Sequence, residues 1–268
     1  MTNFRVDSLG YAPPTVRQRE FPSSLEIRKG PYLAQLISSD REIIAALRLR
    51  FEVFNLELNE GLASAFTCGH DADEFDSICD HLIVEYLPTR RVIGTYRLQT
   101  GNTALHNLGY YGEREFDFRP YEALRSELVE LGRACIHRDH RSTDVLYLLW
   151  RGIAQYALSR GARYLIGCSS LTSQDPAEGA AVYQSLLNWQ VRDELRTTPQ
   201  REFGLPPSAP SFVTAAVPKL LRTYLAIGAR ICGPPAIDRD FKTIDFLTLL
   251  DLHQLHPRIR ARFLDPPS

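Results

Sequence analysis

The order of strand-like and helix-like segments is the feature that most restricts how this chain can fold. Apolar runs rich in β-branched and aromatic residues predict strands at 32–37, 81–86, 92–99, 127–136 and 162–169. Apolar residues at helical spacing predict helices at 39–54, 144–160 and 175–187. The second and third strands are joined by a short link, which predicts an antiparallel hairpin, whereas strands and helices alternate later in the chain. We therefore predict an α+β fold with one mixed, mostly antiparallel sheet rather than a doubly wound one.

Polar and proline-containing stretches divide the chain into an arm, a domain and a long loop. Residues 1–28 are polar and hold three prolines, so we expect a loosely held N-terminal arm. Residues 29–268 are predicted to form a single domain, in which the stretch 188–217 is a loop or lid. The C-terminal extension has a predicted helix at 218–228, strands at 229–232 and 243–250, and a short basic helix at 256–263.

Composition and charge exclude several classes of protein. Of the 268 residues, 44% are hydrophobic and 24% are charged, the proportions of a globular protein and not of a disordered or fibrous one. The net charge of −1 gives no overall basic surface, so we expect no nucleic-acid partner. The five cysteines form no CxxC pair, which fits a reducing compartment, and the sequence has no apolar run of about 20 residues to cross a membrane. We expect a cytoplasmic protein.

Several common catalytic patterns are absent from the sequence. It has no G-x-S-x-G nucleophile motif, no P-loop and no G-x-G-x-x-G, which argues against serine hydrolysis, phosphoryl transfer and dinucleotide chemistry. Cys68, His70, Cys79 and His81 carry ligand atoms, but their spacing is not that of a common zinc site. We therefore expect no metal.

Three short stretches are informative in combination. They are Arg50-Phe-Glu-Val-Phe54, then Asp73-Glu-Phe-Asp76 before the hairpin that contains Gly94-Thr-Tyr-Arg97, and then Glu130-Leu-Gly-Arg133. In this order they resemble the branch of the GNAT superfamily that holds the acyl-homoserine-lactone synthases and the bacterial N-acyl amino acid synthases. The segments DHLIVEYLPTRRVIGTYRLQT, ELGRACIHRDHR and ICGPPAIDRDFKTIDFLTLLDL resemble most the ornithine-lipid N-acyltransferases, and the resemblance covers about residues 30–265.

The resemblance implies a GNAT-like twisted sheet flanked by helices, and a matching chemistry. These enzymes join a long 3-hydroxyacyl chain, carried as a phosphopantetheine thioester on acyl carrier protein, to the α-amine of ornithine. Acyl carrier protein and a small amino acid are then the expected partners, and no permanently bound cofactor is expected. The alternatives are an acyl-homoserine-lactone-type autoinducer synthase and a non-catalytic GNAT-fold module that binds carrier protein or lipid.

Transfer of an acyl group to an amine needs a carboxylate that takes a proton and a donor that holds the oxyanion. The resemblance points to Glu130 and Arg133 as a catalytic pair, yet residues three apart on a regular strand face opposite sides of the sheet. Gly132 lies between them, so we predict a β-bulge that brings both to one site. Such a bulge leaves an amide of Ala134 or Cys135 free to bind the thioester carbonyl oxygen. The alternative is a regular strand with Glu130 and Arg133 in structural ion pairs.

Charged residues upstream of this strand are candidates for substrate binding. Asp73 and Asp76 can present two carboxylates in one turn toward an ammonium group or toward arginines, or they can belong to a solvated acidic loop. Arg97 lies on a strand between apolar residues, where an unpaired charge is costly, so we predict a buried network with Asp73, Asp76 or Glu130. With the residues that the resemblance and the bulge add, the substrate-binding set is Arg50, Phe54, Asp73, Asp76, Arg97, Ala134 and Cys135.

The segment before the predicted helix at 144–160 bears on the acyl donor. GNAT enzymes that use coenzyme A cradle its pyrophosphate with a Gly-rich turn here, but residues 137–143 contain no glycine, which argues against coenzyme A. A phosphate of phosphopantetheine can still bind at this helix N-terminus, and arginines can attract an acidic carrier protein. The residues in question are Arg138, Arg141, Ser142 and Thr143, whose alternative role is a helix cap with solvated arginines. Tyr183 matches the position from which many GNAT enzymes protonate the leaving thiolate, or it packs in the core.

Two features of the C-terminal extension have open roles. Asp238, Asp240 and Asp245 resemble the family, and they either bind the amine or cap turns. The basic and apolar stretch 218–231 either contacts an anionic membrane surface, which would place the protein at the inner face of the membrane, or packs in the core.

Overall fold

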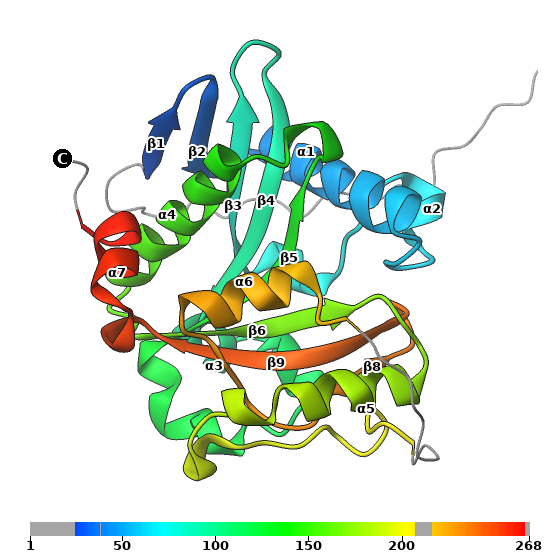
Figure 1. Ribbon diagram of the computed structural model, residues 1–268. Helices are drawn as coiled ribbons and strands as arrows, with labels where there is room; N and C mark the ends of the chain where they lie inside the picture. The colour runs from blue at the N-terminus through cyan, green and yellow to red at the C-terminus, as the bar shows by residue number, and fades with distance from the viewer. Residues whose placement is uncertain (1–24, 38, 207–215, 266–268) are drawn as a thin grey trace, which may run out of the picture.

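A nine-stranded sheet is the frame of the protein, for which the computed structural model describes residues 25–37, 39–206 and 216–265. The strands are β1 (Glu26–Lys29), β2 (Tyr32–Leu36), β3 (Asp80–Tyr86), β4 (Arg91–Thr100), β5 (Leu128–Ile136), β6 (Tyr164–Leu171), β7 (Arg230–Ile231), β8 (Ala236–Asp238) and β9 (Thr243–Asp251). Their order is β1-β2-β3-β4-β5-β6-β9-β7, with β8 paired to β9 (Figure 1). Among these strands only β5 and β6 pair in parallel. The predicted mixed, mostly antiparallel sheet is confirmed.

Helices cover both faces of this sheet (Figure 1). They are α1 (Asp40–Arg50), α2 (Ala65–Cys68), α3 (Gly101–Leu105), α4 (Thr143–Ser159), α5 (Pro176–Ser185), α6 (Lys219–Ile227) and α7 (Pro257–Phe263). In one half of the sheet, Ile83 on β3 packs with α1, whereas its neighbour Leu82 packs with α4 on the opposite face. In the other half, Phe246 on β9 packs with α5 and α6, and Leu247 packs with aromatic residues of the segment 116–121. Because successive strand residues face opposite sides, each strand contributes to two apolar layers.

The elements with strong local signals are present where the sequence predicts them. β3 and β4 form the hairpin, and the helix predicted at 144–160 is α4. The helix predicted at 218–228 is α6, which follows Pro218 and ends at Gly228, whose φ is 116°. At α5, the side chain of Asp175 accepts a hydrogen bond from the Ala177 amide and so caps the helix.

The arm and the long loop differ in part from the expectation. The boundary of the arm at residue 28 is wrong, because Glu26–Lys29 forms β1 and pairs with β2; the arm residues 1–24 lie outside the described part. Of the loop 188–217, residues 207–215 also lie outside it. The described residues before them are mostly irregular, but an isolated bridge joins Gln190 to Ile231 of β7.

Two further parts of the fold have no counterpart among the predicted elements. Between β4 and β5 the chain forms α3 and 3-10 helices at Tyr111–Arg114 and Arg119–Glu127. Near the C-terminus, the three residues of β8 pair with β9. These elements are too short to show a periodic pattern of apolar residues.

Two irregularities of β5 open the middle of the sheet. β5 pairs with β6 only from Leu128 to Glu130, and beyond this point the two strands diverge (Figure 1). Toward β4, Cys135 pairs with Thr95 and Gly132 with Arg97, so that one residue of β4 lies opposite two of β5. The predicted β-bulge is thereby confirmed. Within the bulge, the backbone of Arg133 adopts a left-handed conformation, with a φ of 51°.

Gly167→Ala is expected to destabilise the protein by about 1–3 kcal/mol. A Cβ at position 167 would lie 2.3 Å from the carbonyl oxygen of Leu131, a backbone atom that cannot retreat without disturbing β5. Gly132→Ala is the matched control, because a Cβ there meets no atom within 4 Å. Urea unfolding of the two variants measures the difference, and equal stability of both would contradict the close approach of β5 and β6.

Candidate active site

A cavity of about 260 Å³ lies where β5 and β6 diverge. One part of its lining, here called the apolar wall, belongs to a single core cluster and comprises Tyr96, Trp150, Leu165, Tyr224, Ala229 and Leu250. The polar residues of the lining, here called the polar wall, include Gln99, Tyr111, Glu115, Glu130, Arg133, Asp238, Thr243 and Asp245. The hydroxyls of Tyr96 and Tyr224 are hydrogen-bonded to each other at 2.5 Å, which satisfies the two hydroxyls of the apolar wall. The cavity can hold an aliphatic chain beside a small polar molecule.

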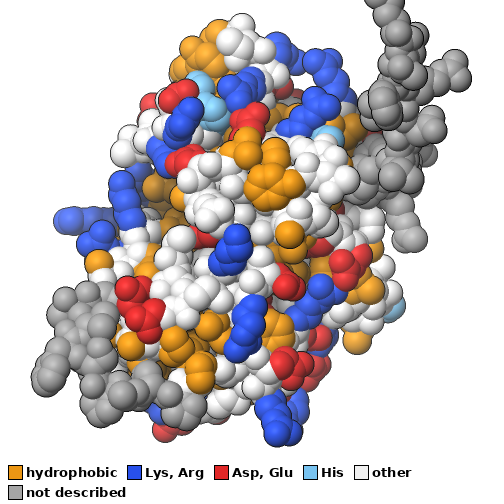
Figure 2. Space-filling view, turned by 90° about the vertical axis from the view of Figure 1, so that its right-hand side faces the viewer, with side chains coloured by type: hydrophobic (Ala, Val, Ile, Leu, Met, Phe, Trp, Pro, Cys, Tyr) orange, Lys and Arg blue, Asp and Glu red, His pale blue; other side chains and the backbone are white. Residues whose placement is uncertain are grey.

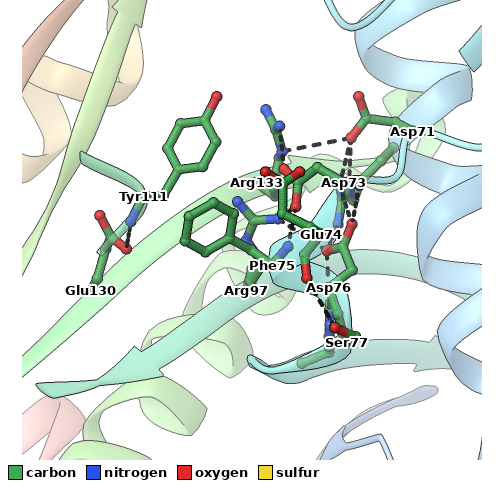
Figure 3. Close-up of polar contacts among 12 residues, drawn as sticks. Asp71, Asp73, Glu74, Phe75, Asp76, Ser77, Arg97, Tyr111, Glu130 and Arg133 are labelled. Carbon is green, nitrogen blue, oxygen red and sulfur yellow. Dashed lines mark hydrogen bonds and ion pairs between the residues drawn. The ribbon is translucent and has the colours of Figure 1, made fainter. Parts of the chain in front are cut away.

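Glu130 on β5 is buried at the polar wall. Its Oε2 accepts a hydrogen bond from the Tyr111 amide at 2.8 Å (Figure 3). Its Oε1 accepts one from the Gly112 amide at 2.7 Å. Burial raises the pKa of the Glu130 carboxyl to about 7, although the two amide hydrogen bonds act in the opposite direction. A carboxyl that ionises near neutral pH can take a proton from an amine and release it again.

Three arginines and three aspartates form a buried ion-pair network beside this wall (Figure 3). Arg50, at the end of α1, donates to Asp71 at 2.8 Å and to Asp76 at 2.6 Å. Arg97 on β4 donates to Asp73 at 2.6 Å and to Asp76 at 3.1 Å. Arg133 in the bulge donates to Asp73 at 2.8 Å. The positive and negative charges balance, so the network is electrically neutral.

The network confirms one prediction and overturns one alternative. Arg97 lies in a buried network with Asp73 and Asp76, as its apolar surroundings predict, but without Glu130 as an ion-pair partner among the described residues. The alternative of a solvated acidic loop is wrong, since Asp76 is 2% exposed. Asp71 belongs to the same acidic stretch and was not predicted as a site residue.

The arginines determine how the aspartates ionise. Burial alone would raise the pKa of Asp76, but the guanidinium groups of Arg50 and Arg97 outweigh it and hold the pKa well below its usual range. For Asp73, Arg97 and Arg133 likewise outweigh burial and lower the pKa of the carboxyl. These aspartates are therefore ionised at neutral pH and form ion pairs with the arginines.

The bulge places Glu130 and Arg133 at one cavity but not in contact as an ion pair. The Arg133 guanidinium lies over the Phe241 ring, 3.9 Å from its centroid, while it pairs with Asp73. The alternative of a regular strand is wrong, because the register shifts at this point. Its structural ion pair is found for Arg133, with Asp73, but not for Glu130 among the described residues. Arg133 fixes the polar wall to the network, and Glu130 remains available to a ligand.

The other predicted substrate-binding residues fall into two groups. Phe54, in a π-helical turn (Phe51–Glu57) that continues α1, and Ala134, in the bulge, line the cavity. Arg50, Asp73 and Asp76 do not line it, and they act through the network. The side chain of Cys135 packs in the cluster around α1.

The residues predicted to bind the phosphate lie at the N-terminus of α4. Ser142 caps the helix by accepting a hydrogen bond from the Val145 amide, and Arg141 forms an ion pair with Glu57 at 2.7 Å. Arg138 and Thr143 are exposed. The predicted role of these residues in binding the donor stays a prediction.

Tyr183, predicted to protonate the leaving thiolate, lies on α5. Its side chain packs against the cluster around α5 and α6, and its hydroxyl accepts a hydrogen bond from Gln190 at 2.8 Å. It does not line the cavity, which favours the core-packing alternative.

An acidic group in the polar wall was not found by sequence reasoning. Glu115, Cys168 and Asp245 place their polar atoms within 4.8 Å of one another. Burial and then the neighbouring Asp245 raise the pKa of Glu115 well above its usual value, and burial raises the pKa of Asp245 to about 6. These residues come from three distant segments of the chain, so no local pattern connects them. Sequence reasoning singled out Asp245 together with Asp238 and Asp240, but it left the roles of these aspartates open.

Comparison with known proteins identifies the family. Residues 49–151 match the family model of the acetyltransferase (GNAT) domain. The L-ornithine N(alpha)-acyltransferase of Rhizobium meliloti (strain 1021) is 32% identical over 240 residues, which cover 84% of this chain and 81% of that protein. The chain belongs to the L-ornithine N(α)-acyltransferase family. The enzyme of the same name from Brucella abortus (strain 2308) is 32% identical over 247 residues, covering 86% of this chain and 88% of the relative.

A solved structure has a similar fold. FeeM, an N-acyl amino acid synthase from uncultured soil microbes, superposes with a TM-score of 0.52 at 12% identity, covering 87% of this chain and 94% of that chain. At this identity the likeness shows the fold alone. The family membership shows that the protein is an acyltransferase. Glu130 and the two walls of the cavity are the candidate parts of its active site.

Proposed function

We propose that the protein transfers a long acyl chain, such as a 3-hydroxyacyl chain, from the phosphopantetheine thioester of acyl carrier protein to the α-amine of ornithine. One observation carries this proposal: Glu130, with a pKa of about 7, lies in a cavity that has an apolar wall for the chain and a polar wall for the amino acid. The names of the relatives supply the acceptor.

The reaction is a direct attack of the neutral α-amine on the thioester carbonyl. As the C–N bond forms, Glu130 takes the proton that the nitrogen must lose. The oxyanion is held by an amide of the bulge, for which Ala134 is the better candidate because it lines the cavity. The C–S bond then breaks, and the proton on Glu130 is available to the leaving thiolate.

The segment before α4 supports a carrier protein rather than coenzyme A as the donor. The amides of Asp139, His140 and Ser142 already donate hydrogen bonds to acceptors within the segment, so they do not form an open cradle for a pyrophosphate. Figure 2 shows basic and acidic side chains mixed on the face that it views, without a continuous field of one sign. Docking of an acidic carrier protein then depends on a few local cations such as Arg138.

The proposed reaction is tested by incubating the purified protein with ornithine and with acyl carrier protein or coenzyme A carrying the same acyl group. We expect mass spectrometry to detect N-acylornithine acylated on the α-nitrogen, with the carrier-protein thioester as the preferred donor. Formation of product from coenzyme A alone would overturn the assignment of the donor. Absence of any acylated amino acid with either donor would overturn the proposed function.

Arg138→Glu is expected to raise the KM for the acyl carrier protein thioester about tenfold at low salt, because it reverses an exposed charge that faces an acidic partner. The kcat should stay unchanged. Arg192→Glu, at an exposed arginine in the segment after α5, is the matched control and should leave the KM as it is. An equal rise in KM for both variants would point to a general effect of charge instead of a docking site.

The contact with a membrane surface predicted for residues 218–231 has less support. The buried residues of α6 include Leu221, Tyr224 and Leu225, so the apolar side of this helix packs against the domain. In the described part of the chain, no helix combines the length and the apolar character that crossing a bilayer requires. Membrane contact stays a prediction.

A further inference from the structure

The polar wall of the cavity holds carboxyl groups that no cation of the described residues pairs with. Five carboxyl groups belong to the lining: Glu60, Glu115, Glu130, Asp238 and Asp245. Within the described residues, none of the five forms an ion pair with a lysine or an arginine. The two arginines of the lining, Arg97 and Arg133, are already paired with Asp73, which lies behind the wall. A cationic ligand would therefore find carboxylates that have no other cation.

Three of these carboxyl groups gather on the side formed by the C-terminal extension. Asp245 on β9 pairs in register with Ser170 on β6. Asp238 is the last residue of β8, which also pairs with β9. Glu115 reaches them from the segment between β4 and β5, and its polar atoms lie within 4.8 Å of those of Asp245. One oxygen of Asp238 accepts hydrogen bonds from the turn that follows β8, which fixes the position of this carboxylate.

A second observation is that two polar atoms beside this cluster have no hydrogen-bond partner. The Oδ1 atom of Asp245 and the Oγ1 atom of Thr243 are buried and have no hydrogen-bond partner among the described residues, and both residues line the cavity. Asp245 is 5% exposed and Thr243 is 2% exposed. Buried polar atoms are nearly always hydrogen-bonded, because leaving one without a partner costs free energy. A group that brings hydrogen-bond donors and a positive charge would satisfy them.

We infer that Glu115, Asp238 and Asp245 bind the side-chain ammonium of a diamino acid and so select the acceptor. This inference rests on the proposed function. An ammonium group has three donors and no acceptor, which matches a cluster of carboxyl oxygens and a hydroxyl. With the side-chain ammonium held there, the α-amine can reach Glu130 in the same cavity. Burial and the neighbouring carboxyls raise the pKa of Glu115 and Asp245 when no cation is present, and a bound ammonium would lower both pKa values.

A divalent metal ion is the rival occupant, because Cys168 contributes a third ligand atom beside Glu115 and Asp245. A metal needs the thiolate form of cysteine. The Cys168 thiol donates a hydrogen bond to Glu115 at 3.9 Å. A protonated thiol that serves as a donor fits an ammonium site better than a metal site.

The test compares ornithine with norvaline, which has the same carbon chain but no terminal amine. For the unmodified protein we expect kcat/KM to favour ornithine by about 100-fold or more, because norvaline leaves the buried carboxyls unpaired. Asp245→Asn and Glu115→Gln should lower this ratio at least tenfold through a higher KM for ornithine, with a smaller change in kcat/KM for norvaline. Asp240→Asn, at an exposed aspartate of the adjacent turn, is the matched control and should keep the ratio.

Several results would overturn the inference. One is an unchanged ratio in Asp245→Asn and Glu115→Gln while norvaline is still turned over, which also shows that the variants are folded. Another is one zinc ion per chain in the purified protein that Cys168→Ser removes. If the unmodified protein acylates no amino acid, the proposed function fails, and calorimetric binding of ornithine and norvaline then decides the inference alone. Ornithine binding that Asp245→Asn weakens at least tenfold would support the site, and equal binding of both amino acids would overturn it.

Discussion

Glu130→Gln is expected to lower kcat/KM for acyl transfer by about 10²–10⁴-fold, the range that removal of a general base usually produces. The amide has nearly the same shape as the carboxyl but cannot accept the proton that the α-amine loses. Rates are measured with a saturating acyl donor at several ornithine concentrations. Turnover within tenfold of the unmodified protein would remove Glu130 from the mechanism.

The pH profile separates a general base from a residue that only supports the cavity. Burial raises the pKa of Glu130 to about 7, so its active, ionised form is lost as the pH falls below that value. The acceptor amine must also be neutral, and this requirement lowers the rate in the same direction. Glu115 and Asp245 also titrate in the cavity, but they are common to both proteins. Below pH 7, kcat/KM of the unmodified protein should therefore fall about tenfold more per pH unit than that of Glu130→Gln. Equal slopes would contradict proton transfer to Glu130.

The folding of Glu130→Gln has to be checked independently. The carboxylate accepts hydrogen bonds from two amides, those of Tyr111 and Gly112, whereas the glutamine side chain has a single acceptor oxygen. One buried amide then lacks a partner, at a cost of about 1–3 kcal/mol. Circular dichroism and thermal unfolding show whether the variant is folded at the temperature of the assay. A folded variant that has lost its activity isolates the chemical role of Glu130.

The bulge of β5 and the position of Arg97 show what the sequence can predict. A glycine between two polar residues of a strand is a local signal, and so is an arginine flanked by apolar neighbours, because an unpaired charge there would be costly. Asp71 lacked such a signal, since its partner Arg50 lies on another element. The same holds for Glu115, from the segment between β4 and β5, and for Asp245 on β9, which are far apart in the sequence and meet only in the folded protein. Local sequence patterns thus predict helices and strands, whereas the polar wall forms only when distant segments of the chain come together in the fold.

Asp76→Asn is expected to lower the free energy of unfolding by about 3–5 kcal/mol at pH 7, because it removes one partner of a buried network and leaves two guanidinium groups short of a counter-charge. Asp76 accepts hydrogen bonds from Arg50 and Arg97 and also from the amide of Asp73, whose own side chain caps the same turn. Its loss therefore weakens α1, β4 and this turn together. Urea unfolding at constant pH measures the change.

Asp144→Asn provides the matched control for Asp76→Asn. It removes an aspartate from an ion pair with Lys29 at 3.4 Å in which both side chains are more than 40% exposed, so the expected cost is below about 1 kcal/mol. The arginines hold the pKa of Asp76 below its usual range, so its contribution to stability is present above the pKa of an unfolded aspartate, about 4. The contribution is lost as the pH falls through the lower pKa of the folded state. The stability difference between Asp76→Asn and the unmodified protein should thus be constant from pH 5 to 8 and shrink in acid. A difference that grew in acid would mean that Asp76 is protonated in the native protein and that the arginines are neutralised by other groups.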